Sequence, residues 1–130
     1  MSVSAAFLRL AVLIALFGIG LGIFMAFSGQ FELVSVHAHI NLLGWVSMFL
    51  YGLFYRSFPT AERGWLGRAH FGFSTIGFLL FVPTLTAIKL AGPSLPSILG
   101  GAIAALLVLI GAVLFTVVVF RHTGREATPT

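Results

Sequence analysis

Four long apolar runs constrain this chain more than any other feature of its sequence. They cover about residues 7–27, 34–55, 65–89 and 98–120. Each is close to the roughly 20 residues that a helix needs to cross a bilayer. The links between the runs are too short to form a further domain. We therefore predict an all-α membrane protein in which residues 1–130 form a single four-helix transmembrane domain.

The basic residues predict how this bundle is oriented. If successive helices alternate in direction, Lys89 lies at one end and the arginines lie at the other: Arg9, Arg56, Arg63, Arg68, Arg121 and Arg125. Positively charged ends stay on the cytoplasmic side, so we expect both termini in the cytoplasm of a bacterial-type inner membrane. The arginines are scattered over helix ends, and the net charge of +4 therefore gives no reason to expect nucleic acid as a partner.

Polar side chains interrupt the second run near its predicted outer end. These side chains are His37, His39 and Asn41. Inside a membrane, each needs a hydrogen-bond partner, a metal or a cofactor. Residues two apart are separated by about 200° around an α-helix, so the two histidines point to nearly opposite sides. Asn41 and Gly44 follow His37 on its own flank, where Gly44 would let a flat macrocycle approach the backbone. The alternative is that both histidines only make interhelical hydrogen bonds.

The remaining histidines do not complete a metal site with this pair. His39 and His70 differ in predicted depth by about 15 Å, whereas two axial nitrogens on one iron lie within about 4–5 Å. We expect His70 to be a packing or interfacial residue near the inner end and His122 to be a solvated interfacial residue. The chain has no cysteine, which excludes thiolate ligands.

A single chain therefore offers two half-sites. Copies arranged around a closed axis would bring the His37 flank of one chain to the His39 flank of the next. Imidazole above and below a plane is the ligation that a low-spin haem b accepts.

The order of residues in the second and third runs resembles a known family, the catalytic subunits of haem–copper oxygen reductases and nitric oxide reductases, and is most similar to the C-type enzymes. The likeness to the family's tenth helix is carried by His37-Ala38-His39, Leu43-Gly44-Trp45-Val46, Tyr51-Gly52, Tyr55 and Pro59. The likeness to its eleventh helix is carried by Trp65, Arg68-Ala69-His70-Phe71, Ile76-Gly77-Phe78, Pro83 and Leu90-Ala91-Gly92-Pro93. The first and fourth runs match only as hydrophobic spans.

This resemblance implies haem as the occupant of the two half-sites. In the family, the histidine that matches His37 binds the high-spin haem and the one that matches His39 binds the low-spin haem. The histidine that matches His70 is not an iron ligand. The family's subunit has twelve helices in three similar arcs of four, and this chain looks like one arc standing alone. The resemblance thus implies a homotrimer that rebuilds the ring.

The departures from the family limit the expected chemistry. A threefold ring lacks the distinct copper-binding helix with its three histidines and crosslinked tyrosine. No Asp, Glu or Lys lies in the middle of a run, so no proton path of the usual kind can be drawn and proton pumping is not expected. If both axial positions of each iron are filled, electron transfer or haem binding is favoured over gas reduction.

Three hypotheses follow. The first is an inner-membrane haem b protein whose iron is held between chains by His37 and His39, near the outer face, with Asn41 and Gly44 beside the cofactor. Its electron donor or acceptor, a redox protein or a quinone, stays open. The second is a minimal oxygen or nitric oxide reductase with a five-coordinate haem. The third is a membrane protein whose histidines bind copper or zinc.

Overall fold

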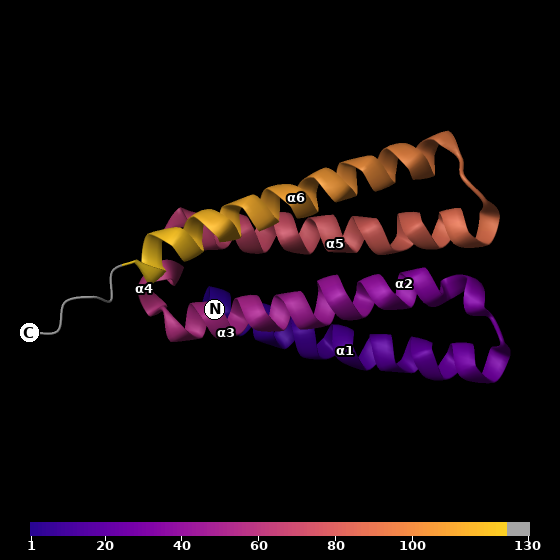
Figure 1. Cartoon of the computed structure of the whole chain (residues 1–130), viewed down its shortest axis with the longest axis horizontal. Coiled ribbons are helices and arrows are strands. Elements are labelled where there is room, and N and C mark those ends of the chain that lie inside the picture. The colour runs from indigo at the N-terminus through magenta and orange to yellow at the C-terminus, as the bar shows by residue number, and fades with distance from the viewer. Residues whose placement is uncertain (125–130) are drawn as a thin grey trace, which may run out of the picture.

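The computed structural model describes residues 1–124, and within them the chain forms helices and no strand. Figure 1 shows two helical hairpins that lie side by side and are joined by a short helix at one end. The elements are α1 (Val3–Ser28), η1 (Phe31–Leu33), α2 (Val34–His39), η2 (Ile40–Ser47), α3 (Met48–Ser57), α4 (Pro59–Glu62), α5 (Trp65–Ala91) and α6 (Leu95–Thr123). The first hairpin contains α1 to α3, and the second contains α5 and α6. The prediction of an all-helical fold is confirmed.

The helix ends follow local capping chemistry. The Ser2 side chain accepts a hydrogen bond from the Ala5 amide and begins α1. Ser94 and Ser97 form a reciprocal capping box at the start of α6. Gly29 ends α1 with φ of 70°, a left-handed conformation that glycine adopts without a steric penalty. These caps extend the predicted helices by a few residues at their ends.

The second membrane-spanning segment is not one regular α-helix. Its first turn, η1, is a 3₁₀-helix, and η2 is a π-helix of eight residues between α2 and α3. A π-helix is rare and occurs frequently at functional sites. The change begins at Ile40, directly after His39. In contrast, α5 stays one helix through Pro83.

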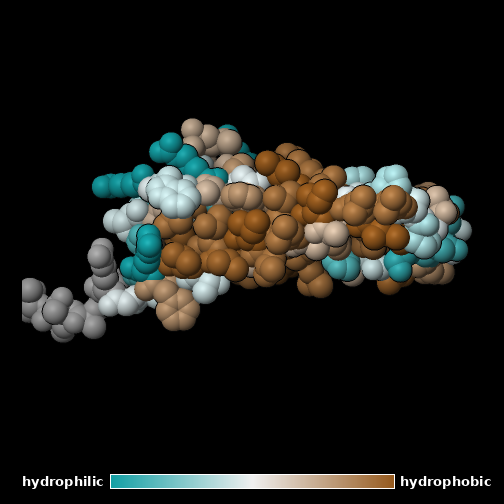
Figure 2. Space-filling view, turned by 90° about the horizontal axis from the view of Figure 1, so that it is seen from above, coloured by the Kyte–Doolittle hydropathy of each residue, from teal (hydrophilic) through white to brown (hydrophobic). Residues whose placement is uncertain are grey.

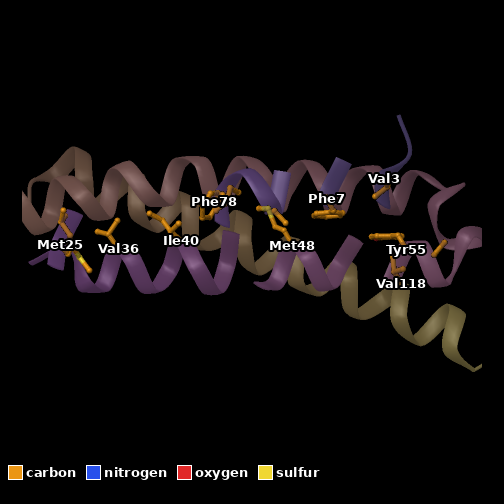
Figure 3. Packing of buried hydrophobic residues seen from close by; sticks show 13 residues of the cluster. Val3, Phe7, Met25, Val36, Ile40, Met48, Tyr55, Phe78 and Val118 are labelled. Carbon is orange, nitrogen blue, oxygen red and sulfur yellow. The ribbon is translucent and has the colours of Figure 1, made fainter. Parts of the chain in front are cut away.

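Glycines allow the helices within each hairpin to approach closely. A side chain added at Gly52 of α3 would come within 2.7 Å of Leu8 in α1, and one added at Gly77 of α5 would come within 2.9 Å of the Val108 backbone in α6. The two hairpins meet through a core of apolar side chains that includes Phe7, Met48, Tyr55, Phe78 and Val118, drawn in Figure 3. Close glycine contacts are a common way of packing helices in lipid.

The face of the molecule drawn in Figure 2 is apolar in the middle and polar at both ends. Four segments are long and apolar enough to cross a membrane, namely Val3–Ser28, Phe31–Ser57, Trp65–Ala91 and Leu95–Thr123. Large apolar side chains such as Leu16, Phe17 and Leu109 are exposed on this surface. An exposed apolar belt of this height is the surface expected against lipid. The chain is therefore a multi-pass membrane protein.

The first helix begins and the last helix ends at the same end of the bundle, beside α4 (Figure 1). We call this the α4 end, and the opposite end, where η1 lies, the Glu32 end. Arg56, Arg63 and Arg121 lie at the α4 end, and Lys89 lies at the Glu32 end. Arg125 lies outside the described residues. The placement of the α4 end in the cytoplasm stays a prediction.

The contact at Gly77 predicts a stability difference between two glycines of the same helix. The change Gly77→Ala forces α5 away from the Val108 backbone and should lower the free energy of unfolding by about 1–3 kcal/mol. Gly72→Ala is the matched control because a side chain there meets nothing within 4 Å. Unfolding of both variants in detergent measures the difference, and equal stability would contradict this packing.

Candidate functional site

His37 and Asn41 face α1 of their own chain. The His37 ring lies over Gly22, where an added side chain would come within 2.9 Å of Cε1, and Asn41 lies over Gly18, with a corresponding distance of 2.7 Å. The Asn41 amide nitrogen donates to the His37 carbonyl at 2.9 Å. The same nitrogen lies 3.3 Å from His37 Nδ1 and 3.4 Å from Nε2. The amide can therefore donate to whichever of the two ring nitrogens carries the lone pair.

His39 lies on the opposite side of α2 and faces α5. Its ring packs against Phe81, with 5.0 Å between the ring centroids. Nδ1 of His39 lies 2.7 Å from the Ser35 carbonyl. A carbonyl only accepts hydrogen bonds, so Nδ1 carries the proton and donates. Nε2 then holds a lone pair, in a ring that is half-buried and fixed in orientation. The predicted divergence of the two histidines is confirmed.

Gly44 lies on the same face as His37 and Asn41, as expected, but that face is covered. A side chain added at Gly44 would come within 2.6 Å of Ile14 in α1 and within 2.5 Å of Phe78 in α5. Gly44 is itself buried. The open backbone that the sequence suggested for a macrocycle is therefore filled by apolar side chains of the same chain, because α1 folds back onto this flank.

One chain does not assemble a metal site from its own side chains. Within residues 1–124, no group of three His, Cys, Asp or Glu side chains converges. His39 packs against Phe81 of α5. His70 also belongs to α5 but precedes Phe81 by eleven residues, which is about 16 Å along the helix axis. His39 and His70 thus lie at different levels of the bundle. The two half-exposed histidines of α2 remain two separate half-sites.

Comparisons with protein-family models, with curated proteins and with solved structures gave no match for this chain.

A second polar cluster lies towards the α4 end and contains His70. This histidine is fully buried, and the Tyr55 hydroxyl lies 3.0 Å from its Nδ1. Its ring is surrounded by the rings of Phe7, Tyr51 and Phe115 at centroid distances of 4.9, 4.5 and 5.1 Å. The burial of His70 agrees with the expectation that it serves packing.

Little in the order of residues predicts that Tyr55 pairs with His70. The two residues come from α3 and α5, fifteen positions apart, and meet only because α4 turns the chain back. The signal in the sequence was that Tyr51, Tyr55 and His70 all lie in apolar runs. Tyr51 and Tyr55 are also four residues apart, which places them on one face of a helix. His122, expected to be solvated, is half-buried, and its Nδ1 donates to the Val118 carbonyl.

The Tyr55–His70 hydrogen bond predicts a measurable cost. Tyr55→Phe leaves the buried Nδ1 without a partner and should lower the free energy of unfolding by about 1–3 kcal/mol. Tyr51→Phe is the matched control, because the Tyr51 hydroxyl makes no side-chain hydrogen bond within the described part of the chain. Detergent unfolding measures both variants, and a smaller loss for Tyr55→Phe than for Tyr51→Phe would contradict the assignment.

Proposed function

We propose that this protein is an inner-membrane haem b protein that transfers electrons or binds haem, with the iron held between neighbouring chains. The observation that carries the proposal is the state of His39. Its Nδ1 donates to a backbone carbonyl, which leaves the Nε2 lone pair free in a half-exposed ring of fixed orientation. Metal-binding histidines are usually held in this way by a hydrogen bond from the second ring nitrogen. His39 thus fits an axial ligand as it stands.

His37 fits the same role only if its ring leaves Asn41. Both ring nitrogens of His37 lie near the Asn41 amide, so the lone pair of the imidazole is not free to bind iron in this conformation. The His37 ring is half-exposed, however, and it lies beside Gly22, which has no side chain to hold it in place. Rotation about its side-chain torsions would release a nitrogen without moving the helix. We assign His37 as the second ligand, supplied by the neighbouring chain.

The assembly follows from the direction of the two histidines. One chain cannot place both on one iron, because they lie on opposite sides of α2. In a closed ring of identical chains, each His39 faces the His37 of a neighbouring chain. The resemblance of residues 34–93 to the haem–copper oxygen reductases favours three copies. In this arrangement the haem lies near the Glu32 end, and the excess of arginines at the α4 end supports our proposal that the Glu32 end is at the outer face of the membrane.

Haem b, when bound, would supply a one-electron iron couple. The chain's own residues would hold and orient it and exclude water through the apolar helices. An electron donor or acceptor, a redox protein or a quinone, would meet the complex in or at the membrane. Two axial histidines favour electron transfer over the reduction of oxygen or nitric oxide.

The optical spectrum of the purified protein tests this function. The wild-type protein should show a Soret band, and His39→Ala should lose it, because the ligand that is oriented for iron is gone. His122→Ala is the matched control, since His122 has the same bond from Nδ1 to a carbonyl but lies at the α4 end. A wild-type protein without a Soret band, or an unchanged band in His39→Ala, would contradict the proposal.

Two other outcomes separate the alternatives. A shift of the reduced spectrum with carbon monoxide would indicate an open coordination position and favour a minimal gas reductase. Elemental analysis that finds copper or zinc and no iron would favour a metal-binding membrane protein.

A further inference from the structure

An apolar groove lies between α1 and α5 in the half of the bundle toward the Glu32 end. It consists of two neighbouring cavities of about 300 Å³ and about 110 Å³. Phe17, Ile40 and Val82 line both cavities, so the two form one continuous groove. The larger cavity alone has the size of a small binding site.

The groove has a buried floor and an exposed rim. Val36, Ile40 and Phe78 form the floor, and each is at most 5% exposed. Figure 3 shows these three side chains one after another along the core. Leu13 of α1 and Leu79 of α5 form the rim, and both are exposed on the apolar belt. The groove therefore opens toward lipid.

The wall of the groove offers no free polar side chain. Thr86 is the one residue of this wall with a polar side chain, and its hydroxyl donates to the Val82 carbonyl at 2.8 Å. This bond satisfies the hydroxyl within its own helix. Pro83, which also lines the groove, has no amide hydrogen to donate. The groove therefore suits a hydrocarbon chain and not a polar ring.

The length of the groove matches one leaflet of a bilayer. It is closed on the side of the α4 end, because α1 and α5 are in contact there, with 4.9 Å between the ring centroids of Phe7 and Phe71. From Phe78 to Lys89, α5 rises by about 16 Å. Half of the hydrocarbon core of a bilayer is about 15 Å thick. A helix of another chain would need a groove through the whole core, whereas the acyl chain of a lipid reaches only to its middle.

A cation lies at the open end of the groove. Lys89 is three residues after Thr86 and seven after Val82, which places it on the face of α5 that lines the groove. It is exposed in the last turn of the helix. Lysines near the ends of membrane-spanning helices extend to the interface, where the phosphates of lipids lie. Within residues 1–124, Lys89 is the only lysine or arginine at the Glu32 end.

We propose that this groove binds one phospholipid of the leaflet at the Glu32 end. One acyl chain lies between α1 and α5 and ends near Phe78, and the phosphate lies beside the ammonium group of Lys89. Val36 and Ile40 of the floor belong to the segment that carries His37 and His39, so the lipid contacts this segment directly. The site does not rest on the presence of haem.

Native mass spectrometry of the full chain tests the site. Protein stripped of lipid in detergent is titrated with phosphatidylglycerol, or with diacylglycerol that has the same acyl chains and no phosphate. The affinity for the first lipid bound by each chain is measured. The wild-type protein should prefer phosphatidylglycerol about fivefold, as expected for one lysine beside a phosphate.

A filled groove should bind neither lipid. Val82→Trp places a large side chain in the space that both cavities share, and it should abolish binding at concentrations that saturate the wild-type protein. Val113→Trp is the matched control, because Val113 is exposed on α6 and does not line the groove. It should bind both lipids as the wild-type protein does.

Lys89→Gln tests the headgroup without changing the groove. It should lower the affinity for phosphatidylglycerol to that for diacylglycerol and leave the affinity for diacylglycerol unaltered. Glu32→Gln is the matched control for charge, because it removes the carboxylate of the same end and should not weaken the binding of phosphatidylglycerol.

Three results would overturn the proposal. The first is equal lipid binding by Val82→Trp and Val113→Trp. The second is an unchanged preference for phosphatidylglycerol in Lys89→Gln, which decides the matter even if Val82→Trp does not fold. The third is a wild-type protein that binds no lipid and forms a complex that Val82→Trp splits, which would assign the groove to a second copy of the chain.

Discussion

The structure depends on how the few polar side chains of the membrane-spanning helices find hydrogen-bond partners where no water is present. Unpaired polar groups in hydrocarbon are costly, so each must find a partner inside the protein. Asn41 bonds to the His37 carbonyl, His39 bonds to that of Ser35, and His70 bonds to Tyr55. Within the described part of the chain, these pairings leave Nε2 of His39 and Nε2 of His70 without a hydrogen bond, and the bond from His122 to the Val118 carbonyl leaves its Nε2 in the same state.

The Nε2 atoms of His39 and His70 lie at different levels and have different surroundings. His39 is half-exposed near the Glu32 end, so its lone pair is available to a group that arrives from outside the chain. His70 is buried among aromatic rings near the α4 end, and its Nε2 makes no hydrogen bond within residues 1–124. The π-helix that begins after His39 ends at Ser47, beside the small cavity that Tyr51 lines. The segment that connects the two regions is thus the least regular part of the bundle.

The sequence predicted the four membrane-spanning helices and the divergence of His37 and His39, because both follow from run length and helical periodicity. It did not predict that α1 and Phe78 cover Gly44, since this depends on how the first hairpin closes. Nor did it predict the bond from Tyr55 to His70, which requires the turn at α4. The π-helix could not be predicted either, because the spacing of apolar residues does not distinguish it from an α-helix. Haem, the trimer and the cytoplasmic termini stay predictions.

In the proposed assembly, His37 and His39 hold a cofactor only between chains. Native mass spectrometry of the detergent-solubilised complex, with iron and haem counted against protein, tests it most directly. We expect three chains in the complex and one haem for each chain. A monomer that retains haem, or an oligomer that contains none, would contradict it.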